Sequence, residues 1–323
     1  MKINNKFRSM FMAFAVGTAI MTTVSSCSKD DDNPVVTSNT ITDKVVADAS
    51  FSILEKAVIK AGLDGTLKGT GPFTVFAPDD AAFTASGITS ATIDALTAAQ
   101  LKAILLYHTI GAKILAADVP AGPNAKVVTA GGDSVFVTKN GSGVYVNGIK
   151  VTAADIAADN GVIHKIGRVL NPPAGNIVET AVAAGLDSLV KAVTVATNAP
   201  GGDPTLASTL SSAKLTVFAP TNQAFTDVLA ALSLTDINQI PIGTLLAVLR
   251  YHVVGGRAFS SDLTNGNLGM LAGGNTITNL SNGTGGVPTI LGNGNGSNKS
   301  NIVATNIVCR NGVVHLIDRV LLP

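Results

Sequence analysis

The chain contains no tryptophan and few other aromatic residues, with 3 tyrosines and 11 phenylalanines among its 323 residues. Most of its apolar residues are Ala, Val, Leu and Ile, so the sequence predicts cores packed from aliphatic side chains. A length of 323 residues suits two domains of ordinary size. The lack of aromatics disfavours a lectin-type groove, because sugar rings usually stack on aromatic faces.

An excess of charge of either sign is also missing. The 22 Lys and Arg residues and 21 Asp and Glu residues give a formal charge of +1, and removal of a leader that carries Lys2, Lys6 and Arg8 changes it to −2. A near-neutral chain offers no electrostatic footprint for nucleic acid or anionic lipid. We therefore expect no nucleic-acid partner.

Cysteine is nearly absent, with only Cys27 and Cys309 in the sequence. Because Cys27 is assigned to a lipid below, the chain is expected to have no internal disulfide. Cys309 follows Ile307 and Val308, and no neighbouring histidine lowers its pKa, so it is expected to be a small buried apolar residue rather than a reactive thiol.

Residues 1–26 have the pattern of a secretory signal peptide. Three basic residues precede an apolar run from Met10 to about Val24, which is too short and too bounded to be a membrane span. The run ends in Val24-Ser25-Ser26-Cys27, which resembles the lipobox of bacterial lipoproteins. That resemblance implies that Cys27 is acylated, for example by palmitate, and that the chain meets the membrane only through its lipid anchor.

Residues 27–39 form a predicted acidic and polar tether. The run Ser28-Lys29-Asp30-Asp31-Asp32 directly follows the lipidated cysteine. It is similar to the export signal of Bacteroidetes surface lipoproteins. This resemblance implies attachment to the outer membrane with the domains facing outward.

One strand-like segment occurs twice: residues 160–172 return as residues 311–323. A chain that ends on the second copy of such a segment is predicted to consist of two similar units, here residues 40–172 and 173–323. Each segment begins with Asn-Gly, where positive φ is cheap, and is closed by Pro. It is therefore interpreted as the closing strand of its unit.

The two faces of this strand are mixed in polarity. Val162, His164 and Ile166 alternate with Ile163 and Lys165, so neither face is cleanly apolar and both are expected to be partly covered. On this pattern His164, and His315 in the second copy, are expected to be half-buried.

The first unit reads as helices followed by strands. Its expected elements are a helix capped by Thr42-Asp43 and ending near Ala61-Gly62, a strand Phe73–Ala77 stopped by Pro78, a turn capped by Asp79 and Asp80, a helix capped by Ser90 and ending at Tyr107-His108, and strands 127–129, 134–138 and 144–146 joined by Asn-Gly turns.

The second unit repeats this order. A helix is expected over 177–195, a strand over 215–220, and a helix that runs into Tyr251-His252. All four histidines therefore fall at two repeat-equivalent positions. The tract 265–301 is rich in Gly, Asn and Ser and is predicted to be a surface loop or ragged hairpin that buries little.

These motifs together resemble a tandem pair of fasciclin-type domains. The first box of the family is similar to Phe73–Phe83, its Tyr-His motif to Tyr107-His108 and Tyr251-His252, and its second box to residues 160–172 and their copy, with Asn160, His164, Asn311 and His315 as its fold motif. The resemblance implies an α+β fold, with each domain a compact β-wedge with helices packed around it. It also implies adhesion to an unidentified protein, matrix or glycan at the cell surface, without catalysis or cofactor.

Two of the differences between the repeats involve an acidic residue in or next to the repeated motifs. Asp155, at the family's acidic position, is matched by Asn306, and Gly167 is matched by Asp318. The Tyr-His motif has two interpretations, a contact surface or a part of the fold, and its apolar context favours the fold.

An enzyme and a ligand-binding surface module are two further classes of function. The sequence has no nucleophile elbow, zinc-protease or phosphate-loop motif, so an enzyme is not expected. His108, His164 and Asp155 could supply three metal ligands, but Asn306 breaks the set in the second unit, and no metal site is expected. A surface module that binds polysaccharide or small apolar ligands is the alternative function.

Overall fold

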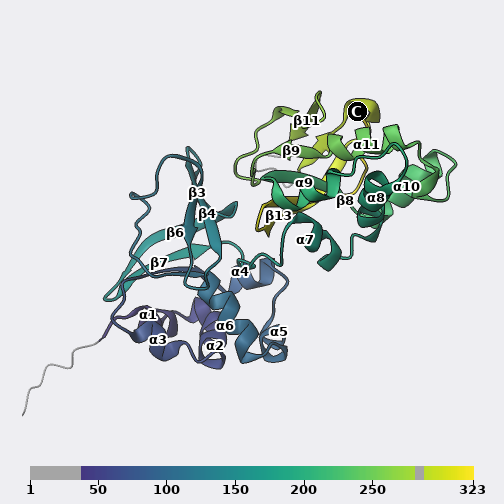
Figure 1. Ribbon diagram of the computed structural model, residues 1–323. Helices are drawn as coiled ribbons and strands as arrows, with labels where there is room; N and C mark the ends of the chain where they lie inside the picture. The colour runs from purple at the N-terminus through teal and green to yellow at the C-terminus, as the bar shows by residue number, and fades with distance from the viewer. Residues whose placement is uncertain (1–37, 281–286) are drawn as a thin grey trace, which may run out of the picture. The chain divides into compact units, whose positions relative to one another are not determined.

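Two successive sets of helices and strands make up the part of the chain that the computed structural model describes, residues 38–280 and 287–323 (Figure 1). The predicted signal peptide, Cys27 and most of the tether lie outside these residues. Within them, no helix is both long enough and apolar enough to cross a bilayer.

In the first repeat the helices lead and most of the strands follow. Its helices are α1 (Ile41–Ala47), η1 (Ala49–Phe51, a 3-10 turn), α2 (Ser52–Lys60), α3 (Asp64–Lys68), α4 (Asp80–Ala85), α5 (Ser90–Ala95) and α6 (Ala98–Tyr107). Its strands are β1 (Phe73–Pro78), β2 (Thr109–Ile110), β3 (Gly122–Val128), β4 (Ser134–Asn140), β5 (Gly143–Val146), β6 (Ile149–Ala158) and β7 (Gly161–Ile166).

The second repeat has the same order. Its helices are α7 (Ile177–Ala183), α8 (Asp187–Asn198), α9 (Leu206–Ser212), α10 (Asn222–Ala231), η2 (Ile237–Gln239), α11 (Ile242–Tyr251) and η3 (Asn293–Asn295). Its strands are β8 (Leu215–Pro220), β9 (Val253–Gly255), β10 (Gly266–Gly269), β11 (Asn275–Asn279), β12 (Thr289–Leu291), β13 (Ser300–Cys309) and β14 (Gly312–Ile317).

Each repeat forms one seven-stranded sheet, and the repeated closing strand lies inside it. The strand orders are β2-β1-β7-β6-β5-β4-β3 and β10-β11-β12-β13-β14-β8-β9. The closing strand is parallel to the first strand and antiparallel to the one before it, with Phe76 opposite His164 and Phe218 opposite His315. The prediction of half-buried histidines was wrong: His164 is 5% exposed and His315 is fully buried.

Both faces of β7 are covered, which explains this burial. Ile163 packs in a cluster with residues of the helices, including Ile41, Leu54 and Leu101, while Ile166 packs with the strands on the opposite face. Figure 1 shows α1, α2, α3 and α5 gathered on one side of the strands of the first repeat. Burial of a large aliphatic side chain contributes about 1.5–3 kcal/mol, so these two clusters anchor the strand from both sides.

The first predicted helix is broken, because capping side chains stand at other positions than expected. Thr40, not Thr42, caps α1, in a capping box with Asp43. Asp48 then accepts a hydrogen bond from the N–H of Ser50 and starts η1, so the expected single helix becomes separate elements. Each side-chain oxygen satisfies a backbone N–H that has no partner within the helix.

The expected helix from Ser90 to Tyr107 is likewise two helices. Thr89, not Ser90, caps α5, and Thr97 caps α6 in a box with Gln100. In the second repeat, the helix predicted over 177–195 divides into α7 and α8 at Gly185, whose φ of +66° ends α7. Asp79 caps α4 as expected.

The glycine of each Asn-Gly pair is needed for space and not for positive φ. Gly161 and Gly312 do not have positive φ, contrary to the expectation from the sequence. A Cβ on Gly161 would collide with the carbonyl oxygen of Phe73, and one on Gly312 with that of Leu215. The parallel strands therefore approach too closely at this point for any side chain.

The tract 265–301 is more ordered than predicted. Its described residues include β10, β11, β12 and η3, and they extend the second sheet. Thr276, Ile290 and Ser300 in this tract are fully buried. The composition was a poor guide because backbone pairing holds these strands: β10 pairs with β11, β11 with β12, and β12 with β13.

Candidate functional site

The tyrosine that ends α6 is held inside the first repeat. Its hydroxyl donates to the carbonyl oxygen of Ser134 at 3.1 Å and accepts from Nδ2 of Asn147 at 3.0 Å. Burial raises the pKa of Tyr107 to about 12, so the phenol stays protonated. The side chain is 1% exposed and presents no surface to a partner.

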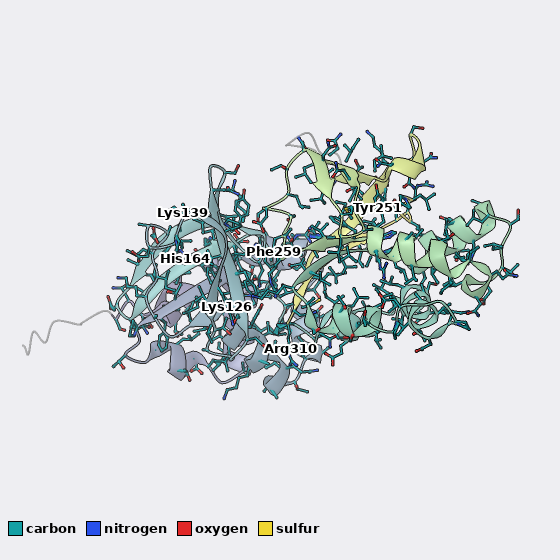
Figure 2. The ribbon with its side chains drawn as sticks, turned by 45° about the horizontal axis from the view of Figure 1, so that its top comes forward. Lys126, Lys139, His164, Tyr251, Phe259 and Arg310 are labelled. Atoms are coloured by element: carbon teal, nitrogen blue, oxygen red, sulfur yellow. The ribbon has the colours of Figure 1, made fainter. Side chains whose placement is uncertain are left out.

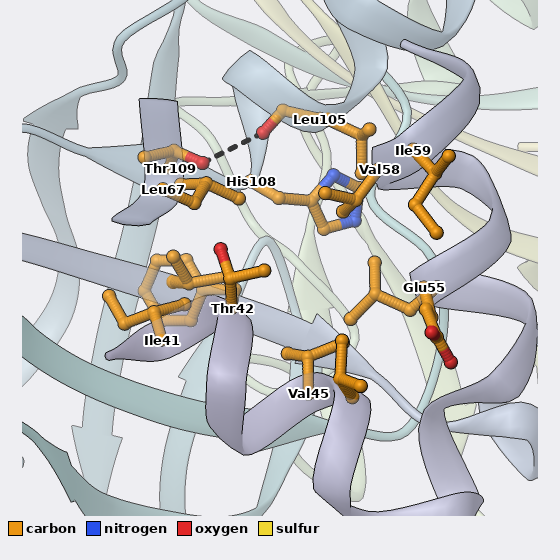
Figure 3. Close-up of a pocket in the computed structure, with 14 residues that line it drawn as sticks. Ile41, Thr42, Val45, Glu55, Val58, Ile59, Leu67, Leu105, His108 and Thr109 are labelled. Atoms are coloured by element: carbon orange, nitrogen blue, oxygen red, sulfur yellow. Dashed lines mark hydrogen bonds between the residues drawn. The ribbon is translucent and has the colours of Figure 1, made fainter. Parts of the chain in front are cut away.

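The adjacent histidine is bonded at both ring nitrogens. Nδ1 of His108 lies 2.8 Å from the carbonyl oxygen of Ile104, and Nε2 accepts from the backbone N–H of Leu170 at 2.9 Å. Figure 3 shows His108 beside Val58 and Leu105, in the small apolar space of about 30 Å³ between α1, α2 and α6. His108 therefore ties the end of α6 to the segment that follows β7.

The second histidine joins three other parts of the repeat. Nδ1 of His164 accepts from the backbone N–H of Asp155 at 3.1 Å, and Nε2 lies 2.9 Å from the carbonyl oxygen of Ile114. Its ring centroid lies 5.8 Å from that of Phe76 on the neighbouring strand. Figure 2 labels His164 among the strands of the first repeat.

These contacts fix the tautomers of both rings. A carbonyl oxygen can only accept, so His108 carries its proton on Nδ1 and His164 carries its proton on Nε2. In each ring the other nitrogen receives a backbone N–H. Neither ring has a free lone pair, so neither can bind a metal ion or accept a proton without breaking a hydrogen bond.

Five of these six hydrogen bonds recur in the second repeat, at distances of 2.6 to 3.4 Å. The exception is the bond from Asn147, because the Tyr251 hydroxyl accepts from the backbone N–H of Asn293 at 3.2 Å instead. Tyr251 is labelled in Figure 2. The backbone partners are Asn275 for Tyr251, Val248 and Leu321 for His252, and Ala258 and Asn306 for His315. Burial lowers the pKa of His108, His252 and His315 to about 4, so these rings are neutral at physiological pH.

The asparagine of the repeated segment connects the first helix to the sheet. Oδ1 of Asn160 accepts from the N–H of Ile41 at 2.9 Å, and its Nδ2 donates to the carbonyl oxygens of Leu67 and Gly69. Asn311 makes the same three bonds, to Ile177, Leu210 and Ala213. One side chain thus satisfies three backbone groups at the end of each helical layer.

The exchange of Asp155 for Asn306 leaves the local geometry unchanged. Both residues have positive φ, +60° and +63°, and both accept a backbone N–H through Oδ1, from Ala116 at 2.9 Å and from Ser260 at 2.8 Å. Asp and Asn tolerate this backbone conformation better than other non-glycine residues. Asn306 also donates from Nδ2 to Oγ of Ser260 at 2.8 Å, so the exchange keeps the backbone conformation and the Oδ1 contact and adds one side-chain hydrogen bond.

Sequence reasoning missed two residues that close the loop over the sheet. The hydroxyl of Thr74 donates to the carbonyl of Ala112 and accepts from the N–H of Ile114, and Asp118 accepts from the N–H of Leu115. The second repeat uses Thr216 and Asp262 in the same way. An alignment of the two repeats would have matched both pairs.

The structure does not assemble the metal ligands considered above. Within residues 38–280 and 287–323 no three His, Cys, Asp or Glu side chains are grouped to hold a metal ion. His108 and His164 are engaged by separate sets of backbone groups. Cys309 is buried, and burial raises the pKa of its thiol, which disfavours the reactive thiolate.

Two larger apolar spaces lie in the repeats. A cavity of about 310 Å³ lies within the first sheet and reaches His164. A second one, of about 250 Å³, lies between α7, α8, α9 and α11 in the second repeat and reaches His252. Its counterpart in the first repeat is the 30 Å³ space of Figure 3, so the two repeats differ in how tightly the helices close over the sheet.

Aromatic side chains are not available on the described surface. Tyr107 and Tyr251 are buried, Tyr145 is half-buried, and none of the phenylalanines in the described ranges is exposed. Exposed apolar residues are aliphatic instead. Val46 and Val182, at matched positions in α1 and α7, are 52% and 58% exposed.

Comparison with known proteins agrees with the repeat structure. The Fasciclin domain model matches residues 49–172 and residues 190–323. Protein sll1483 of Synechocystis sp. is 41% identical over 138 residues, which are 42% of this chain and 74% of that protein. The transforming growth factor-beta-induced protein ig-h3 of Sus scrofa is 39% identical over 135 residues, which are 42% of this chain but only 20% of that protein.

A solved FAS1 domain pair, from the insect cell adhesion molecule Fasciclin I, aligns with 87% of this chain and 96% of its own, at 18% identity and a TM-score of 0.38.

Proposed function

This chain belongs to the fasciclin family, whose domain it carries twice, and we propose that it is a non-catalytic, lipid-anchored adhesion protein of the cell surface. The observation that supports this proposal most is that the side chains of the repeated motifs hold the fold together. Tyr107, His108, Asn160 and His164 are all engaged by groups of their own repeat. These four side chains are therefore not available to a partner, and a partner would have to contact other, exposed residues.

The character of that surface favours a protein or matrix partner over a glycan. Sugar recognition usually relies on exposed aromatic faces, and the described surface has none. Val46 and Val182 place an exposed aliphatic side chain on the first helix of each repeat. We propose these two positions as part of the contact surface.

The anchor in this proposal is Cys27, and the acidic run Asp30–Asp32 directs the protein outward. Several acyl chains on one residue would hold the domains stably on a bilayer. The tether would let both domains reach a partner beyond the membrane.

Localisation and adhesion can be tested separately. Metabolic labelling with an alkyne fatty acid should mark the wild type and not Cys27→Ser, and protease added to intact cells should digest the wild-type domains. Replacement of Asp30, Asp31 and Asp32 by Asn should leave labelling intact and protect the domains. Protection of the wild type on intact cells would refute the outward orientation.

Adhesion is tested with beads coated with the chain from Ser28 onward. Wild-type beads should attach to cells or matrix of the producing community, and the double variant Val46→Glu/Val182→Glu should attach several-fold less. Val303→Glu, at another exposed valine, is the matched control. Equal attachment of wild-type and uncoated beads would refute an adhesive role.

A further inference from the structure

The cavity within the first sheet has the walls of a binding site for an apolar molecule. Its volume is about 310 Å³, and it is lined by residues of all seven strands of the first sheet and of the loop 111–121. The side chains that line it are mainly aliphatic, among them Ile110, Val119, Val127, Val137 and Val151.

The polar groups of this cavity are already bonded within the protein. Thr74 donates to the carbonyl of Ala112 and accepts from the N–H of Ile114, and both nitrogens of His164 are engaged. Of the described residues, only Asn124 and Thr180 carry a buried polar atom without a partner, and neither lines the cavity. Among the described residues, a ligand inside would therefore meet no buried side-chain donor or acceptor that lacks a partner.

Water is a poor occupant of such a space. At about 30 Å³ per molecule, roughly ten waters would fill it, with few polar partners for any of them. Engineered apolar cavities of about half this volume stay dry and take up benzene. An apolar guest would recover the dispersion contacts that the lining side chains lose to an empty space.

Two charged residues line the cavity, Asp118 and Lys126, and both are exposed. Asp118 accepts from the N–H of Leu115 at 2.9 Å. The rest of the lining contains no Asp, Glu, Lys or Arg, so a carboxylate carried beyond these two residues would lose its hydration without gaining an ion-pair partner.

We propose that the first repeat binds one small neutral apolar molecule, aliphatic or aromatic, of about ten to fifteen non-hydrogen atoms in this cavity. This site is separate from the proposed adhesion positions, because neither Val46 nor Val182 lines the cavity. The cavity would give a surface protein a means to carry or sense a hydrophobic compound.

The test uses the chain from Ser28 onward and the neutral fluorescent probe 1-aminoanthracene. The wild type should bind the probe saturably, with n-butylbenzene competing. The variant Val119→Leu/Val127→Leu/Val151→Ile adds a methylene or methyl group at three lining positions. It should bind at least tenfold more weakly, since the added groups occupy the space of the guest.

These three replacements are side chains that the fold already accepts. Leu263, Leu268 and Ile302 stand at the matched positions of the second repeat, as its equivalent hydrogen bonds and strand pairs show. The control is Ala207→Leu, which adds three carbon atoms to the lining of the 250 Å³ space of the second repeat and should leave probe affinity unchanged.

Covalent mapping keeps the test decisive if the triple variant folds poorly. A neutral alkyl diazirine, photolysed with the wild type, should label residues that line the cavity, and n-butylbenzene should suppress this labelling. Absence of saturable binding, loss of binding in Ala207→Leu alone, or labels confined to other residues would overturn the proposal. Binding of dodecanoate but of neither neutral compound would overturn it as well.

Discussion

Mild acid should lower the stability of the second repeat more than that of the first. His108 in the first repeat and His252 and His315 in the second are buried and neutral, and burial lowers the pKa of each from 6.5 to about 4. Between these two pH values the unfolded chain binds protons that the folded chain does not. Stability is therefore full above about pH 6.5 and is lost as the pH falls towards 4.

The loss of stability at low pH can be calculated from the lowered pKa values of these histidines. Each pKa unit corresponds to about 1.36 kcal/mol, so at pH 5 each histidine lowers the free energy of unfolding by about 2 kcal/mol relative to neutral pH. The second repeat, with two such histidines, should lose about 4 kcal/mol and the first about 2 kcal/mol. Both losses are large beside a typical total stability of about 5–15 kcal/mol.

Carboxylates do not obscure this window. Hydrogen bonds lower the pKa of Asp43, Asp48, Asp203 and Asp236 below the ordinary value of 3.8. A carboxyl group with a lowered folded pKa contributes stability above its unfolded pKa and loses it only as the pH falls below that value. Their contributions therefore remain nearly constant between pH 7 and pH 5.

Native-state hydrogen exchange measured by mass spectrometry can read the two repeats separately. The free energy of opening should be followed for peptides from β7 and β14 at pH 7, 6 and 5, with exchange rates corrected for pH. His252→Gln should reduce the pH slope of the second repeat by about 1.4 kcal/mol per unit and leave that of the first unchanged. Equal opening free energies of β14 at pH 7 and pH 5 would refute the reasoning.

Three substitutions test the residues that the repeated motifs place inside the fold. Asn160→Ala removes three hydrogen bonds to backbone groups and should lower the free energy of unfolding of the first repeat by about 2–4 kcal/mol in urea titration. Gly161→Ala should lower the free energy of unfolding by at least about 2 kcal/mol, because its Cβ meets a backbone carbonyl. Gly141→Ala, with open space around it, should lower the free energy of unfolding by less than about 1 kcal/mol. Equal losses in the two variants would contradict the close approach of the strands at Gly161. Tyr107→Phe should cost about 1–2 kcal/mol and leave bead attachment unchanged, and loss of attachment in a stably folded variant would show that the hydroxyl meets a partner.

Local signals in the sequence were sufficient to identify the repeat and many of its elements. The strand before Pro78, the capping role of Asp79 and the end of α6 at Tyr107 all follow from short-range backbone chemistry. Helix breaks were harder to locate. Thr40 and Thr89 cap their helices from positions just before those predicted, because several adjacent polar residues could each have served.

The roles of the histidines were beyond the reach of sequence reasoning. Their repeat-equivalent positions showed that they matter, but both tautomers depend on backbone groups far along the chain, such as Leu170 for His108 and Ile114 for His164. The tract 265–301 was misjudged for a similar reason, since its strands are held by pairing with distant backbone.

The sequence by itself determined that the chain is two copies of one unit, because a repeat is visible without any contact between residues. It also determined which residue types recur at matched positions of the two copies. Only the tertiary structure decided that the closing strand lies inside its sheet, that the histidines are buried in opposite tautomers, and that the first sheet encloses an apolar cavity. Those properties depend on which distant segments meet, and hydrophobic packing and backbone pairing settle that jointly for the whole fold.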